Sequence, residues 1–183
     1  KILMALCDGM GSGSSAEKVS SLALSLIENF YKAGFDSSII LSNVNKLITM
    51  KGEENFSALD ICVFDLRQSF CDIVKLGSPM GFLKRKDETY VIEAGALPLG
   101  IIEDVKPNLS SYALNENDMI ILMTDGVIDA FGDFEELKAF VNDLKISNPQ
   151  TLADCVLEEA LRKCGNYAPD DMTILIGKIW QKI

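Results

Sequence analysis

The sequence predicts an α+β fold in which helices pack on antiparallel β-sheet. Two patterns support this prediction. Apolar residues recur at helical spacing over two long N-terminal stretches and two C-terminal stretches. Between them, from Ser57 to Met123, short runs of β-branched and aromatic residues alternate with turn residues, as in consecutive hairpins. With 183 residues, of which 48% are hydrophobic, the chain can build the core of one domain, and we expect a single domain over residues 1–183.

The N-terminal part is predicted to form a buried strand followed by two helices. Ser14 and Glu17 have the spacing of a capping box, which marks the start of the first helix. The expected elements are a strand at Ile2–Cys7, a turn at Asp8–Gly13, and helices at Ser14–Ala33 and Ser37–Met50, the second ending near Lys51 and Gly52.

The middle of the chain is predicted to form hairpins, and the end two helices and a strand. The first hairpin joins Ser57–Leu66 to Phe70–Leu76, and the second joins Gly81–Lys84 to Thr89–Glu93 across Lys86–Glu88. The later expected elements are a loop or strand edge at Pro98–Ile101, a turn at Asn115–Asp118, a strand at Met119–Met123, helices at Asp133–Leu144 and Thr151–Cys164, and a last strand at Met172–Ile179.

Charge and composition exclude several classes of function. The net charge of −10 disfavours binding to nucleic acid, whose phosphates would repel the chain. The chain has no histidine, which excludes Ser–His and Cys–His nucleophiles and typical zinc sites. The five cysteines have no CxxC spacing and lie among apolar neighbours, so we expect reduced core residues of a cytosolic protein.

The N-terminus indicates a piece of a longer protein. The chain begins at Lys1 in what is predicted to be a strand, and the apolar run at Ile2–Cys7 is too short for a signal peptide. No apolar stretch reaches the length of a membrane span. We therefore expect an N-terminally truncated fragment.

Three aspartate positions share an unusual setting at the ends of apolar strands. Asp8 follows the first strand, Asp125 follows Met119–Met123, and Asp170 and Asp171 precede the last strand. Asp-Gly pairs are common in turns, so a purely structural role is one interpretation. The other is a site for a hard divalent cation, which relieves the repulsion between converging carboxylates and needs only oxygen ligands. Mg²⁺ or Mn²⁺ fits such a site.

Several short motifs occur in an order typical of one enzyme family. They are Asp8-Gly9-Met10-Gly11, Leu59-Asp60, Leu76-Gly77-Ser78, Leu97-Pro98-Leu99-Gly100-Ile101, Thr124-Asp125-Gly126-Val127 and Pro169-Asp170-Asp171-Met172-Thr173. In this order the chain resembles bacterial protein phosphatase 2C-like (PPM) enzymes, most closely the phosphatase domain of stage II sporulation protein E. The resemblance implies an antiparallel β-sandwich flanked by helices, in α-β-β-α layers, here without the N-terminal strands.

The resemblance also implies a site that binds two ions, Mn²⁺ or Mg²⁺. Asp8, Asp125 and Asp170 would be the catalytic ligands, and Gly9 would offer its backbone carbonyl. Asp60 and Asp171 are expected next to the ligands or in a regulatory role. Asp60 lies in a strand with almost no other polar residue, so a hydrogen bond within the sheet is the simpler interpretation of this residue. A metal-activated water would attack phosphoserine or phosphothreonine.

The function implied is a metal-dependent serine/threonine phosphatase that acts on a phosphorylated anti-sigma factor antagonist and so controls a sporulation sigma factor. This domain would lie in the cytoplasm, and only upstream segments would anchor the full-length protein in a membrane. We also consider a homodimer. The alternative is a catalytically inactive regulatory or protein-interaction domain that keeps the phosphatase fold. The absent strand pair favours this alternative for the fragment, while the retained aspartates favour the enzyme.

Overall fold

The computed structural model of the protein describes residues 1–11, 14–50, 56–86, 88–95, 97–103 and 105–180. The side chains of residues 14 and 15 are not among those described. The proposed capping box at Ser14, the predicted helix end at Lys51 and Gly52, and Asp87 in the second hairpin turn therefore lie outside the described parts. The observed elements, in chain order, are β1 (Ile2–Gly9), α1 (Ser14–Lys32), α2 (Ser37–Thr49), β2 (Ser57–Asp65), β3 (Phe70–Leu76), β4 (Gly81–Arg85), β5 (Glu88–Ile92), β6 (Asn108–Ala113), β7 (Met119–Met123), α3 (Asp125–Phe131), α4 (Phe134–Asp143), α5 (Pro149–Lys163) and β8 (Ile174–Lys178).

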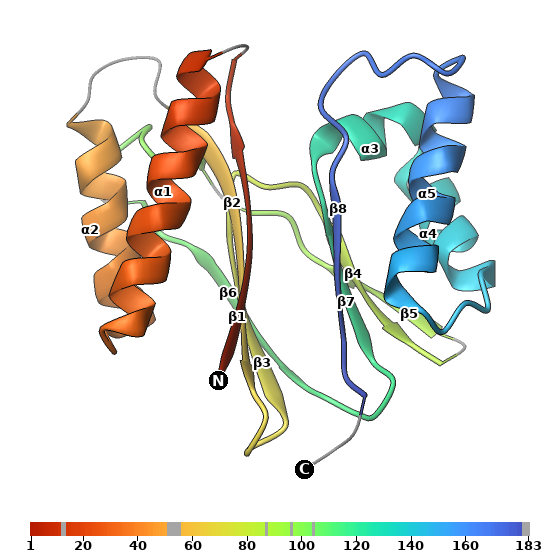
Figure 1. The fold of residues 1–183 in the computed structure, drawn as a ribbon, viewed down its shortest axis with the longest axis horizontal. Coiled ribbons are helices and arrows are strands. Elements are labelled where there is room, and N and C mark those ends of the chain that lie inside the picture. Colours follow the sequence, from red (N-terminus) through yellow and green to blue (C-terminus); the bar gives the residue numbers. More distant parts are fainter. Residues whose placement is uncertain (12–13, 51–55, 87, 96, 104, 181–183) are drawn as a thin grey trace.

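The strands form two four-stranded antiparallel sheets that face each other. One sheet has the order β1-β2-β3-β6 and the other the order β5-β4-β7-β8. Helices α1 and α2 cover the outer face of the first sheet, and α3, α4 and α5 cover the outer face of the second (Figure 1). The predicted α+β sandwich with α-β-β-α layers is confirmed.

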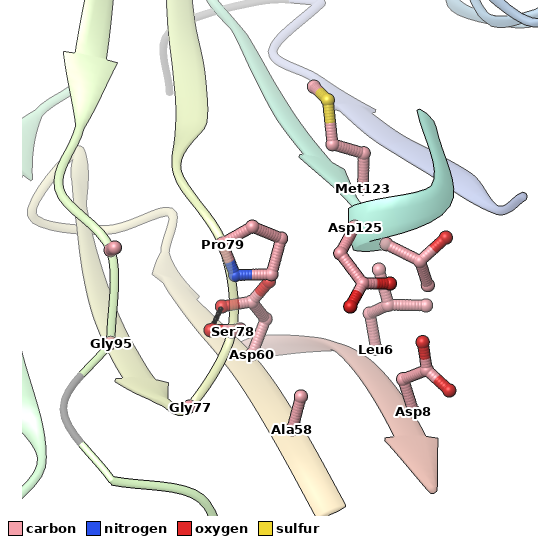
Figure 2. A pocket seen from close by; sticks show the side chains of 12 residues that line it. Leu6, Asp8, Ala58, Asp60, Gly77, Ser78, Pro79, Gly95, Met123 and Asp125 are labelled. Carbon is pink, nitrogen blue, oxygen red and sulfur yellow. Dashed lines mark hydrogen bonds between the residues drawn. The ribbon is translucent and has the colours of Figure 1, made fainter. Parts of the chain in front are cut away.

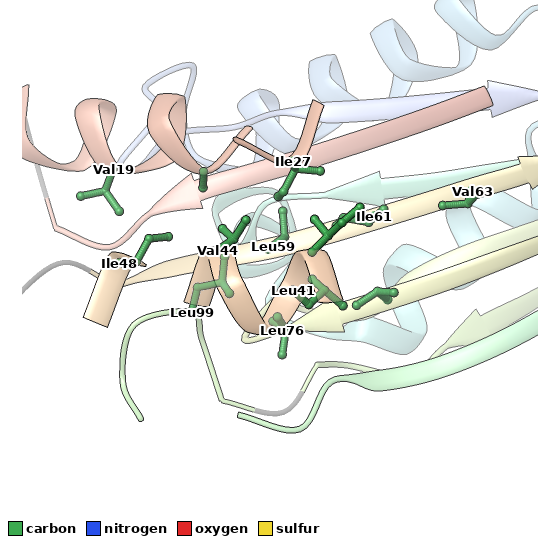
Figure 3. Packing of buried hydrophobic residues seen from close by; sticks show 13 residues of the cluster. Val19, Ile27, Leu41, Val44, Ile48, Leu59, Ile61, Val63, Leu76 and Leu99 are labelled. Carbon is green, nitrogen blue, oxygen red and sulfur yellow. The ribbon is translucent and has the colours of Figure 1, made fainter. Parts of the chain in front are cut away.

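Three hydrophobic clusters correspond to the three interfaces between these layers. Figure 3 shows the first, in which α1 and α2 pack on the β1-β2-β3-β6 sheet around Ile27, Val44 and Ile61. The second joins the other sheet to α3, α4 and α5 and includes Phe82. The third lies between the sheets. Because every sheet face is covered, the strands can be apolar on both sides, as their sequences indicated.

The alternation of side chains along β2 places one carboxylate inside the sandwich. Leu59, Ile61 and Val63 point toward α1 and α2, whereas Cys62 and Phe64 belong to the cluster between the sheets. Asp60 lies on the same face as Cys62, since successive strand residues alternate between faces. The strand pattern thus directs Asp60 toward the space between the two sheets.

Strand β1 continues through Asp8 and Gly9, which were predicted to lie in the turn after it, and two further elements differ from the sequence prediction. Strand β6 was not predicted because its residues are mostly polar and four of the six are exposed, as expected for the edge strand that pairs with β3. The predicted turn at Asp125-Gly126 is instead the first turn of α3, with Thr124 at the N-cap position. This helix has only seven residues, too few for a helical repeat of apolar residues to appear in the sequence.

Helix α5 begins two residues before its predicted start. Asn148 caps it by accepting a hydrogen bond from the Thr151 backbone N–H, and Pro149 occupies the first helical position, where no N–H is needed. The other predicted helices agree with α1, α2 and α4 to within one residue at each described end. Within the part of the chain that the structure describes, no helix combines the length and the apolar character that crossing a bilayer requires.

Candidate functional site

The predicted aspartates converge at one end of the sandwich. Asp8 lies near the end of β1 and Asp125 at the start of α3, while Asp170 and Asp171 precede β8. Asp8 and Asp125 line a cavity of about 280 Å³ between the two sheets, and their side chains face it from different elements (Figure 2). Asp8 also lines an adjoining pocket together with Asp170 and Asp171.

Burial and like charge both act on Asp8. The carboxyl is half-buried, and loss of solvation raises its pKa above the ordinary value. The charges of Asp125, Asp170 and Asp171 raise the pKa further, in that order. No lysine or arginine occurs among the described residues that line the two pockets. The site therefore holds more negative charge than its own residues neutralise.

A threonine links the start of α3, where Asp125 lies, to the segment before β8 that contains Asp170. The hydroxyl of Thr124 donates to the backbone oxygen of Asp171 at 2.8 Å and accepts from the Thr173 backbone N–H at 2.9 Å. The Thr124 backbone N–H also donates to the Thr173 oxygen at 3.1 Å. These bonds fix the 170–173 segment against the start of α3. Sequence reasoning missed this role of Thr124, although the residue is part of a quoted motif.

Two glycines permit close backbone approach at the site. A Cβ on Gly9 would lie 2.3 Å from the backbone oxygen of Ala16, in the first turn of α1. A Cβ on Gly126 would lie 2.6 Å from the backbone oxygen of Asp171. Both distances are far below van der Waals contact, so only glycine fits without displacement. The glycines that follow Asp8 and Asp125 are therefore required by packing.

Asp60 has a salt-bridge partner, which was not foreseen from the sequence. Its Oδ1 accepts a hydrogen bond from the Lys75 Nζ at 2.5 Å and another from the Ser78 hydroxyl at 2.6 Å. All three side chains are almost fully buried, and Asp60 and Ser78 line the cavity with Asp8 and Asp125. Burial raises the pKa of Asp60, and the attraction of Lys75 opposes this shift. Asp60 thus combines both interpretations: it is hydrogen-bonded within the sheet and it lines the site.

The sequence contains a sign of the Lys75–Asp60 pair, but it can be recognised only when the register of β2 against β3 is known. Lys75 is a charged residue in the otherwise apolar end of β3, and it lies directly opposite Asp60 on β2. A buried charge requires an opposite charge. A hairpin with the observed register, Asp60 opposite Lys75, would therefore have indicated the pair.

The residues present fit a hard divalent cation. The carboxylates supply only oxygen ligands, and the excess negative charge around Asp8 is what a cation would relieve. Within the described ranges, however, no three acidic or cysteine side chains already lie in an arrangement that could hold a metal ion. The carboxylates surround two adjoining pockets instead of one point. Metal ligation by Asp8, Gly9, Asp125 and Asp170 stays a prediction.

Cys7, next to Asp8, is unsuited to act as a nucleophile. Burial raises the pKa of its thiol to about 11, and the negative charges of Asp8 and Asp60 raise it too. The thiolate is the reactive form of cysteine, so this thiol stays protonated at neutral pH. The structure agrees with the expected core role.

Comparison with known proteins supports one family. The family model for stage II sporulation protein E matches residues 1–180. A curated relative, stage II sporulation protein E of Priestia megaterium, is 32% identical over 98% of this chain and 32% of its own length. The phosphoserine phosphatase RsbU of Bacillus subtilis (strain 168) is 24% identical over 96% of this chain and 55% of its own length.

Among solved structures, a strong match is the PP2C phosphatase domain of stage II sporulation protein E from Bacillus subtilis, determined with a fragment of its regulatory domain. It has a TM-score of 0.89 and 31% sequence identity, covering 97% of this chain and 54% of that one. The chain spans about a third of the length of the Priestia relative.

Proposed function

Because the chain belongs to the stage II sporulation protein E family, we propose that it is the catalytic part of a metal-dependent phosphoprotein serine/threonine phosphatase. The observation that carries the proposal is the convergence of Asp8, Asp125 and Asp170 on two adjoining pockets at one end of the sandwich. The raised pKa of Asp8 supports it, because the carboxylates repel one another until a cation binds.

The acidic residues would hold the ions, and other groups would shape the site. Asp8, Asp125 and Asp170 would be the ligands, with the Gly9 carbonyl beside them. When bound, Mn²⁺ or Mg²⁺ supplies the positive charge that activates water and stabilises charge developing on the phosphoryl group. Thr124 keeps Asp125 and Asp170 on adjoining segments through its two hydrogen bonds. The phosphorylated side chain would enter the 280 Å³ cavity between Asp8 and Asp125 on one side and Ser78 on the other.

The substrate we propose is a phosphoserine protein, specifically a phosphorylated anti-sigma factor antagonist. Family membership supports this proposal, as does the similarity to a phosphoserine phosphatase.

Phosphate release tests the proposal. We expect a phosphoserine protein to be hydrolysed with Mn²⁺ and not with chelator, and Asp125→Asn to abolish turnover while keeping the far-UV circular dichroism of the parent. Asp129→Asn is the matched control: it removes an exposed aspartate from the same helix at a position that lines neither pocket. The experiment includes both this chain and an N-terminally extended version.

The same assay distinguishes the phosphatase from the alternative function, a catalytically inactive interaction domain. That alternative is favoured by one observation, the lack of a preformed three-residue metal arrangement within the described residues. Absence of Mn²⁺-dependent turnover from both lengths of chain would establish it and refute the phosphatase.

A further inference from the structure

A buried ion pair lies beneath the acidic cavity and is not explained by metal ligation. Lys75 and Asp60 are 2% and 1% exposed and bond at 2.5 Å on neighbouring strands of the same sheet. An ion pair this deep is costly to desolvate and is often no more stabilising than a hydrophobic pair of the same size. A role other than stability is therefore worth seeking.

The pair holds one wall of the cavity in place. Ser78 donates to the Asp60 carboxylate at 2.6 Å, and its own backbone oxygen accepts from the Gly95 backbone N–H at 2.8 Å. Gly77, with φ of +61°, turns the chain between Lys75 and Ser78. The wall opposite Asp8 and Asp125 thus depends on the position of the Asp60 carboxylate (Figure 2).

The pair also sets the charge of the cavity floor. Asp60 lines the same cavity as Asp8 and Asp125, and without Lys75 it would be a further uncompensated carboxylate there. Such a charge attracts a cation and repels a phosphoryl group, and these effects are strong where solvent is excluded. Lys75 cancels this charge without itself lining the cavity.

We propose that Lys75 is a positioning residue of the phosphatase site: through Asp60 it balances the charge of the cavity floor and fixes Ser78 opposite Asp8 and Asp125. This inference rests on the proposed function. It assigns Lys75 and Asp60 no direct contact with the metal ions, and it places Ser78 where it can contact the substrate.

A charge series tests the proposal without requiring turnover. Mn²⁺ affinity is measured by calorimetric titration at low ionic strength and pH 8 for the wild type, Lys75→Met, Asp60→Asn and the double variant. Relative to the wild type, the charge at the floor changes by −1, +1 and 0. We expect Lys75→Met to bind Mn²⁺ more tightly, Asp60→Asn more weakly and the double variant like the wild type, with steps of about three- to tenfold.

Steady-state kinetics with a phosphoserine protein as substrate provide a second test of the proposal. Lys75→Met is expected to raise KM about tenfold through repulsion of the phosphoryl group, and the double variant to return to within about threefold of the wild type. Lys84→Met is the matched control, since Lys84 is a buried lysine that donates to Val141 and Asn142 backbone oxygens away from the cavity. It should lower thermal stability with unchanged Mn²⁺ affinity and KM.

The outcomes separate this inference from the proposed function. Equal Mn²⁺ affinity in all four proteins, each shown to be folded by circular dichroism, would overturn the inference even if turnover is normal. The expected order of affinities, with no turnover by any of the four proteins or by the N-terminally extended chain, would support the charge role and refute the phosphatase. A wild type that does not bind Mn²⁺ would overturn both.

Discussion

The close approach of Gly126 to Asp171 predicts that one added methyl group separates the two halves of the site. In Gly126→Ala, the new Cβ would lie 2.6 Å from the Asp171 backbone oxygen, about 0.8 Å short of the 3.4 Å at which ordinary contact begins. The Thr124 hydroxyl bonds that same oxygen, so the segment cannot retreat without stretching this bond. We expect Asp170 and Asp171 to move away from Asp125.

The effects on stability and on activity should differ in size. Overpacking costs about 1–3 kcal/mol, and replacing glycine within a helix returns up to about 1 kcal/mol. The net loss of unfolding free energy is therefore about 0–2 kcal/mol. Displacement of a catalytic group by close to 1 Å can lower turnover by about 100-fold. Activity should fall much further than the folded fraction explains.

The assay compares Mn²⁺-dependent phosphate release with thermal unfolding in the absence of metal. Gly34→Ala is the matched control, because Gly34 has φ of +81° with no atom near its Cβ position and follows the end of α1. It strains the backbone at a comparable cost of about 1–2 kcal/mol without touching the site. If Gly126→Ala keeps wild-type turnover at saturating Mn²⁺, the reasoning from close packing is wrong.

Three further predictions concern the metal, pH and the core. Mn²⁺ at about 100 times its dissociation constant should stabilise the fold by about 2.7 kcal/mol. This corresponds to a rise in Tm of about 5–10 °C. Differential scanning fluorimetry should show the rise in the wild type, and should not show it in Asp8→Asn or in the presence of chelator. The pKa of Asp8 is raised in the metal-free fold, so its contribution to stability is present below its unfolded pKa and is lost as pH rises through the folded value. Asp8→Asn should therefore be the more stable metal-free protein at pH 7 and lose this advantage at pH 3, which urea unfolding at the two values will check; equal differences at both would contradict the assignment. Phe82 is fully buried and stacks on Phe134 at 5.1 Å between ring centroids, so Phe82→Ala should cost about 3–5 kcal/mol in urea unfolding, whereas the exposed Phe70→Ala should cost far less.

Most of the architecture could be predicted from local pattern. Helices α1 and α2 and the β2–β3 hairpin follow from apolar periodicity and turn residues, and those elements are observed close to their predicted bounds. Strand β6 and helix α3 could not be found in this way. The first is a polar edge strand held by pairing with β3, and the second is too short to show a repeat. Both depend on contacts with distant segments.

For the site, the sequence by itself determined which residues could bind a cation. Asp8, Asp125 and Asp170 stand out because each adjoins an apolar strand. The absence of histidine, together with cysteines that are expected in the core, leaves oxygen donors as the expected ligands. Tertiary structure alone decided how they meet. Pairing of β7 with β8, completed by the Thr124 hydroxyl, brings residues 45 positions apart to one strand end. The register of β2 against β3 likewise decided that Asp60 is neutralised by Lys75, because cross-strand distance depends on pairing and cannot be read from either strand alone.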